Sequence, residues 1–192
     1  MRILMASTSY PRWQDDFAGS FVAAEAEHLA LRGHEVTVVA PHAPGLPVAE
    51  NLPKHVRLRR VRYWSEASQC LCYGGGIPDN LRRHPLAWLQ IPAWWHCLAQ
   101  AIGEEAKGAD VIHAHWTITG ALAISAAIAR HVPLVVTARG SDLSLGNPLL
   151  RHLNRRVFNK CDMLCCVSEA SCAQAIGRGA QPPTPHQRSV VR

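Results

Sequence analysis

Short apolar runs alternate with longer stretches of helical periodicity along most of the chain. In residues 19–33, for example, Phe21, Val22, Ala26 and Leu29 recur at three- and four-residue steps. The apolar runs between such stretches are residues 2–7, 35–40, 111–112, 132–137 and 163–167. Two strands joined through a helix form a crossover unit whose strands run parallel. We therefore predict one Rossmann-like α/β domain, a doubly wound parallel sheet with helices on both faces.

Polar side chains follow two of these strands directly. His115 and Trp116 come after one strand of the central crossover unit, and Arg139 and Asp142 come after the other. Parallel strands joined by a crossover end at the same edge of a sheet, and in open α/β sheets ligands bind at that edge. The pattern therefore places a candidate site at the carboxyl ends of the strands.

The domain pattern covers residues 1–176 and dissolves in residues 177–192. The second stretch contains Pro182, Pro183 and Pro185, and proline interrupts helices and strands. We predict a Rossmann-like domain over 1–176 followed by an irregular, truncated tail over 177–192.

Three further stretches are less regular. Residues 56–63 partly alternate apolar and basic side chains, which predicts an edge strand. Residues 65–79 carry a glycine triplet and predict a loop near the cleft, because no strand leads into the glycines and no helix clearly starts from them. The cysteines of residues 161–172 have a spacing that suits metal ligands, yet this run is typical of a buried strand. We interpret these cysteines as core residues.

The composition allows a packed core and favours anionic ligands. Of the 192 residues, 48% are hydrophobic and 18% are charged, with a net charge of +6. This balance suits nucleotides, phosphates or an anionic membrane surface, but the basic residues are too scattered to indicate nucleic acid. Seven cysteines, without a secretory signal or a membrane-length apolar run, predict a cytoplasmic location. Trp88 and Trp94, beside Arg82 and Arg83, would also suit a helix at the inner membrane face, and a helix that covers the sheet is the alternative.

Five short stretches occur in a characteristic order and spacing. They are Ser9-Tyr10-Pro11 with Gly19, Arg32-Gly33-His34-Glu35-Val36-Thr37-Val38, Asp110-Val111-Ile112-His113-Ala114-His115, Val136-Thr137-Ala138-Arg139-Gly140-Ser141-Asp142, and Val167-Ser168-Glu169. No single stretch is specific, because a Gly-His-Glu-Val run also occurs in other Rossmann-like domains. Together they resemble the N-terminal lobe of retaining glycosyltransferases of the GT-B fold, glycosyltransferase family 4.

The resemblance implies an enzyme of two lobes that transfers a hexose-type sugar from a nucleotide-sugar to a glycan or lipid-linked acceptor, with no metal or other cofactor. It implies that this lobe holds the acceptor, and that the glycine at position 19 lets substrate approach the first helix. The residues implied to bind substrate are Gly19, Asp16, Ser20, Trp116, Gly140 and Asp142. Those implied to act in catalysis are Arg139 and His115.

The chain departs from the family pattern in two respects. Arg139 stands where many relatives carry a histidine, and because arginine stays charged it cannot be a general base. It suits holding a diphosphate, a sugar hydroxyl or an acceptor carboxylate. The structural alternatives are that Arg139 pairs with Asp142, that His115 is a hydrogen-bonded wall residue, and that Asp16 caps its loop. The donor-binding lobe with its paired glutamates does not follow Ile176, so we expect no turnover by the chain alone.

Other function classes are weaker. A stand-alone Rossmann-like module that binds a phosphate or a sugar without chemistry is the main alternative, and a reading frame for a second lobe downstream of codon 192 would argue against it. An NAD-dependent oxidoreductase is disfavoured because residues 9–20 contain a single glycine instead of the close glycine trio of that fingerprint. Nucleophilic hydrolysis is disfavoured because the chain has no Gly-x-Ser-x-Gly turn.

Overall fold

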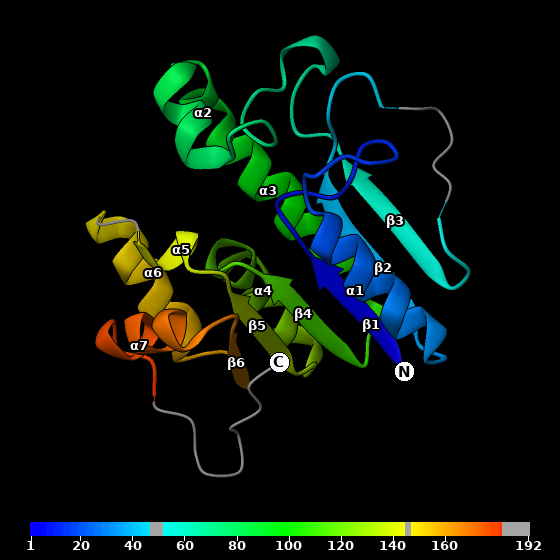
Figure 1. Cartoon of the computed structure of the whole chain (residues 1–192), viewed down its shortest axis with the longest axis vertical. Helices are drawn as coiled ribbons and strands as arrows, with labels where there is room; N and C mark the ends of the chain where they lie inside the picture. Colours follow the sequence, from blue (N-terminus) through cyan, green and yellow to red (C-terminus); the bar gives the residue numbers. More distant parts are fainter. Residues whose placement is uncertain (47–51, 145–146, 182–192) are drawn as a thin grey trace.

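A computed structural model describes residues 1–46, 52–144 and 147–181. Its strands form a six-stranded sheet in the order β3-β2-β1-β4-β5-β6 (Figure 1), and every neighbouring pair is parallel. The strands are β1 Arg2–Ala6, β2 Glu35–Pro41, β3 Val56–Val61, β4 Val111–His115, β5 Leu134–Ala138 and β6 Met163–Cys166. The predicted doubly wound fold is confirmed. The strand order reverses between β1 and β4, and in open α/β sheets the ligand-binding crevice lies outside the carboxyl ends of the strands at such a switch point.

Helices cover both faces of the sheet. Figure 1 shows α1 in front of β1 and β2, with α3 and α4 behind the sheet. The helices are α1 Ser20–Leu31, α2 Ile77–Arg83, α3 Ala87–Glu105, α4 Thr117–Arg130, α5 Ser141–Ser144, α6 Pro148–Phe158 and α7 Glu169–Gly177, with the short 3-10 turns η1 Glu66–Ser68 and η2 Ala106–Gly108. In the described part of the chain, no helix combines the length and the apolar character needed to cross a bilayer.

The alternation of side chains along β4 explains why histidines lie inside the fold. Ile112 and Ala114 point into the core formed with α3 and α4. The residues between them point to the opposite face, because successive side chains of a strand alternate. His113 and His115 therefore face α1, where Val22 and the other apolar residues of that helix pack on β1 and β2. The switch point thus places two imidazoles between the sheet and α1.

The apolar spacing of α3 predicts a buried face of Leu86, Leu89, Trp95, Leu98 and Ile102, and the structure buries only part of it, including Leu98 and Ile102. Trp94, which was expected to suit a membrane surface, is fully buried, whereas Leu86 and Leu89 are 68% and 65% exposed. The buried stripe includes Gln90, whose side-chain amide donates to the Ser68 carbonyl. A satisfied polar residue inside the core is invisible to a hydrophobic pattern, so the pattern counted the exposed Leu86 and Leu89 as buried and missed Gln90.

The same cause affects α6, whose predicted inward face of Leu149, Leu150, Leu153 and Val157 is right at the buried Val157 and wrong at Leu149. Leu149 is 72% exposed, while Asn154 is buried and accepts a hydrogen bond from the Thr117 hydroxyl at 2.7 Å.

Two other predictions are also wrong. The helix α2 begins directly after the glycine triplet, and β6 is a half-exposed edge strand instead of a buried one. Ser168, whose place before the helical stretch predicts a cap, does cap α7, because its side chain accepts from the Ser171 N–H. Residues 182–192 of the predicted tail lie outside the described residues.

Candidate functional site

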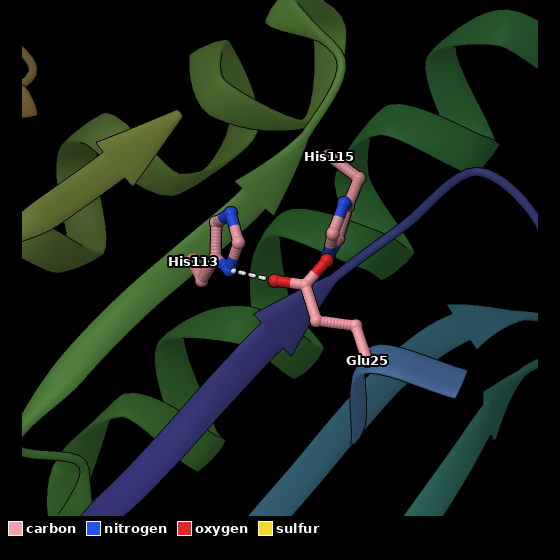
Figure 2. Close-up of side chains that lie close together, drawn as sticks. All are labelled: Glu25, His113 and His115. Atoms are coloured by element: carbon pink, nitrogen blue, oxygen red, sulfur yellow. Dashed lines mark ion pairs between the residues drawn. The ribbon is translucent and has the colours of Figure 1, made fainter. Parts of the chain in front are cut away.

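A group of polar side chains from three separate elements meets at the switch point. We call Glu25 of α1, His113 and His115 of β4, and Arg139 after β5 the Glu25 cluster. Figure 2 shows the Glu25 carboxylate reaching from α1 toward both imidazoles of β4. The pairing of β4 with β5 brings His115 opposite Thr137. Arg139 follows Thr137 by two positions, so its side chain reaches His115 at the end of the sheet.

Short contacts hold the Glu25 cluster together. Glu25 Oε1 lies 3.1 Å from His113 Nδ1, and His113 Nε2 lies 2.8 Å from the Thr137 hydroxyl. Arg139 Nη2 lies 3.0 Å from His115 Nδ1. Glu25 Oε2 is farther from His115 Nε2, at 4.0 Å, and from Arg139 Nη2, at 3.8 Å. The cluster is therefore linked as a chain of donors and acceptors across the sheet edge.

The contact with Arg139 fixes the tautomer of His115. A guanidinium has only donors, so Nδ1 of His115 accepts and the proton of the neutral ring lies on Nε2. Burial, assisted by the charges of His113 and Arg139, lowers the pKa of His115 to about 3, although Glu25 opposes the shift. Nε2 of His115 and Nε of Arg139 have no hydrogen-bond partner among the described residues. Two buried donors thus remain free at the site.

Glu25 stays ionised despite its partial burial. Burial alone would raise its pKa, but the hydrogen bond from His113 and the charges of His113 and Arg139 outweigh that effect and lower it. Burial in turn lowers the pKa of Arg139, while Glu25 opposes the shift. Because arginine titrates so far above neutral pH, its side chain remains a cation beside the carboxylate.

Aromatic rings line the same edge. The Arg139 guanidinium lies over the Phe21 ring, 3.6 Å from its centre, and Trp116 packs edge-on against Phe21 at 5.4 Å. The backbone of Trp116 has φ 69° and ψ 151°, a region occupied almost only by glycine, which costs about 1–3 kcal/mol for other residues. Its N–H donates to the Thr137 carbonyl, which helps to hold the strained conformation. Strain of this kind is concentrated at functional sites.

Comparisons with known proteins show the family and support the fold. The model of Glycosyltransferase Family 4 matches residues 18–185. The chain belongs to glycosyltransferase family 4. No curated protein sequence matches it.

Solved structures similar to the family 4 chain are longer. Sucrose-phosphate synthase from Thermosynechococcus elongatus aligns with a TM-score of 0.65 and 15% identity, over 94% of this chain and 45% of the synthase. A second structure of that synthase aligns with a TM-score of 0.60 and 13% identity, over 90% of this chain and 80% of the other. HepE from Anabaena, in complex with UDP and glucose, aligns with a TM-score of 0.58 and 15% identity, over 95% of this chain and 42% of HepE. These likenesses support the fold, and the chain spans less than half of HepE and of the first synthase structure.

The structure brings three of the expected site residues of this family 4 lobe together. His115, Trp116 and Arg139 lie at one edge of the sheet, linked through Phe21 of α1. Gly19 precedes Phe21 by two residues in the loop that enters α1, so all the predicted segments reach the crevice. The contacts show a common location, and the roles of these residues stay predictions.

Gly19 is packed against protein backbone. A Cβ at this position would lie 2.5 Å from the Ser9 carbonyl oxygen and 2.9 Å from the Tyr10 Cα, and the backbone has φ +77°. Because Gly19 has no side chain, the backbone of the loop that follows β1 can pack directly against it. This internal contact is a structural reason for the glycine, and the expectation that a substrate approaches here stays a prediction.

Asp16 is committed to its own loop. Its carboxylate accepts from Arg12 Nε at 2.7 Å and from the N–H of Arg12 and of Ala18. The hydrogen bond from the Arg12 side chain is the main cause that lowers the pKa of Asp16 to about 2. These contacts are those of the loop-capping alternative, and substrate binding by Asp16 stays a prediction.

We predict that Asp16 makes the protein sensitive to acid. A carboxyl with a lowered pKa stabilises the fold above its unfolded pKa of 3.8 and loses that contribution as the pH falls toward about 2, an effect of about 2 kcal/mol. The Asp16→Asn variant should be less stable than the parent by about this amount at pH 6. Urea unfolding at several pH values checks this. A difference that persists unchanged at pH 2 would contradict it.

The remaining predicted residues flank the Glu25 cluster. Asp142 accepts from the N–H of Thr117 at 2.8 Å and of Arg139 at 3.1 Å. The expected pairing of Asp142 with Arg139 is thus made by the backbone of Arg139, which leaves its guanidinium for the cluster. Gly140 precedes α5 with φ +88°, and Ser20 is an exposed residue at the start of α1.

Two members of the Glu25 cluster were missed in the sequence. His113 was quoted as part of a motif without a role, although it stands two residues before His115 and so faces the same side of β4. Glu25 lies four residues after Phe21, one helical turn along the same face of α1. His113 can be found from His115 by the two-residue repeat of a strand, and Glu25 from Phe21 by the four-residue step of a helix.

Proposed function

We propose that this chain is the acceptor-side lobe of a retaining, nucleotide-sugar-dependent hexosyltransferase that acts on a glycan or lipid-linked acceptor. The proposal is supported by family membership together with one observation, the strained Trp116 beside His115 and Arg139 at the strand ends. Transfer would occur in the crevice between this lobe and a donor-binding lobe. On this proposal the isolated chain has no transferase turnover.

Each residue has a role that its surroundings suit. Arg139 is held by stacking on Phe21 and by Glu25, so its cation is oriented before a ligand arrives, and charge-assisted hydrogen bonds from such a group to phosphate, carboxylate or hydroxyl oxygens are strong. The free Nε2–H of neutral His115 can donate to one further oxygen. Trp116 offers an aromatic ring beside these donors, and no metal or cofactor takes part in this proposal.

The position of the cluster agrees with a site completed by a second lobe. A hollow of about 600 Å³ lies between α3, α4 and α6, and none of its lining residues belongs to the Glu25 cluster. HepE, one of the similar structures, is in complex with UDP and glucose. We propose by analogy that a uridine diphosphate sugar is the donor and that it is bound by the other lobe.

A ligand titration of the isolated chain tests the proposal. We expect acceptor oligosaccharides, drawn from a panel with and without uronic acids, to shift the indole N–H signal of Trp116, which the Trp116→Phe variant assigns. Arg139→Gln should weaken this binding about 10- to 100-fold, because a hydrogen bond to a charged group contributes about 1.5–3 kcal/mol. Arg130→Gln, at the exposed end of α4, is the matched control. Sugar release from UDP-glucose by the chain alone would refute the claim of no turnover.

The second candidate is the binding module without catalysis. This candidate is favoured because every residue of the Glu25 cluster comes from this single lobe. The same titration separates the two candidates. The binding module would be supported if inorganic phosphate or UDP bound saturably and displaced the present contacts of Arg139, while no oligosaccharide gave a response.

We also propose peripheral contact with the cytoplasmic face of a membrane through the start of α3. Leu86, Trp88 and Leu89 are exposed there, next to the basic Arg82 of α2, and such a mixture suits the interface of an anionic bilayer. The Trp88→Ala/Leu89→Ala variant should sediment several-fold less with phosphatidylglycerol vesicles. Ile128→Ala, an equally exposed apolar residue on α4, is the control, and equal sedimentation of both variants would contradict the proposal.

A further inference from the structure

Three side chains of the Glu25 cluster present ligand atoms at one point. A carboxylate oxygen of Glu25 and one ring nitrogen each of His113 and His115 all lie within 4.8 Å of one another. Figure 2 shows these side chains converging from α1 and β4. Bonds to zinc are about 2.0–2.2 Å long, so ligand atoms around one ion lie about 3–4 Å apart. Modest side-chain rotation would bring the three atoms to that spacing.

The surroundings of the two imidazoles suit metal ligands. His115 is fully buried, and its Nε2 has no hydrogen-bond partner among the described residues. His113 uses Nε2 toward the Thr137 hydroxyl at 2.8 Å, which leaves Nδ1 for an ion. A hydrogen bond on the opposite ring nitrogen is the usual way in which a protein orients a metal-binding histidine.

We propose that Glu25, His113 and His115 form a binding site for Zn²⁺ or a related first-row divalent ion. Two imidazoles and one carboxylate are a donor set of zinc sites that keep an open position. Glu25 is 34% exposed, so the fourth position faces the crevice. The proposal is independent of sugar transfer, because it needs neither a substrate nor a second lobe.

Arg139 competes with the ion. Its Nη2 donates to Nδ1 of His115 and lies 3.8 Å from the Glu25 carboxylate. A metal bound at Nε2 of a neutral imidazole places the ring proton on Nδ1, which would then face the guanidinium donor. The ion and the present position of Arg139 therefore exclude each other. Metal binding moves the guanidinium away from His115, and removing Arg139 strengthens metal binding.

Titration of the 192-residue chain tests the site. After treatment with a chelator, we expect calorimetry to show one equivalent of Zn²⁺, and Co²⁺ to give a visible spectrum of nitrogen and oxygen ligation. Glu25→Gln and His113→Ala should abolish this binding, and Thr137→Val should weaken it about 10- to 100-fold through the lost orienting bond. Arg139→Met should bind at least tenfold more tightly. His152→Ala, an exposed histidine on α6, should leave the affinity unchanged.

The contrary results are equally clear. Unchanged affinity in Glu25→Gln or His113→Ala, or a thiolate-to-cobalt charge-transfer band from the seven cysteines, would overturn the site. Equal affinity of Arg139→Met and the parent chain would overturn the competition, and with it the assignment of His115 as a ligand. Circular dichroism identifies a variant that fails to fold, and Glu25→Gln keeps the test decisive because it preserves the shape of the side chain.

Discussion

Replacing Gly19 with alanine is expected to lower the free energy of unfolding by about 2–5 kcal/mol, from the combined cost of a left-handed residue and of overpacking. The added Cβ would lie 2.5 Å from the Ser9 carbonyl oxygen, which belongs to the backbone and cannot turn aside as a side chain can. The loop after β1 would have to move away from α1, next to the crevice. Urea denaturation measures the loss.

Gly33 provides a matched control. It also has a positive φ, +86°, but a Cβ there would meet nothing within 4 Å. Gly33→Ala should therefore cost only the conformational penalty, about 1–2 kcal/mol. The difference between the two variants isolates the close approach of the backbone to Gly19. Equal losses would show that this close approach has no energetic consequence.

Replacing Asp142 with alanine is expected to cost about 2–4 kcal/mol, because two backbone N–H groups lose their acceptor. These groups belong to Thr117, in the first turn of α4, and to Arg139. A carboxylate near a helix N-terminus also interacts favourably with the helix dipole. Thermal unfolding gives the stability, and saccharide titration reports whether Arg139 is still positioned.

The Asp142→Asn variant sharpens this prediction. Asparagine keeps one acceptor oxygen but points an amide N–H₂ at the other backbone donor, so an intermediate loss of stability is expected. Ser141→Ala, the exposed neighbour at the start of α5, serves as the control. If Asp142→Ala were as stable as Ser141→Ala, the hydrogen bonds of the Asp142 carboxylate to the start of α4 and to the residue after β5 would contribute nothing to stability.

The strands and the location of the site were predictable because both depend on local patterns. Alternating apolar runs located all six strands, and the rule for parallel crossovers placed His115 and Arg139 on a common edge. The contacts of Arg139 were not predictable. Its partner Glu25 comes from α1, more than a hundred residues earlier in the chain, and nothing local to either residue records that they meet.

The faces of the helices were less predictable for a different reason. In α3 and α6 the buried stripe contains Gln90 and Asn154, each satisfied by hydrogen bonds to distant segments. Hydrophobic periodicity scores such residues as surface residues, so exposed leucines were assigned to the core instead. The role of Gly19 was missed similarly, because its close neighbours belong to the preceding loop and the sequence does not show where that loop folds back.

The proximity of Glu25 to Arg139 has a consequence for how partners would find this lobe. A carboxylate and a guanidinium less than 4 Å apart, beside an uncharged His115, largely cancel each other's field beyond the first layer of water. The cluster itself would then add little to attraction from afar, which would come from the net charge of +6 on the whole chain and would weaken in physiological salt. Selection among molecules would take place only on contact, by the fit of individual oxygen atoms to fixed N–H groups.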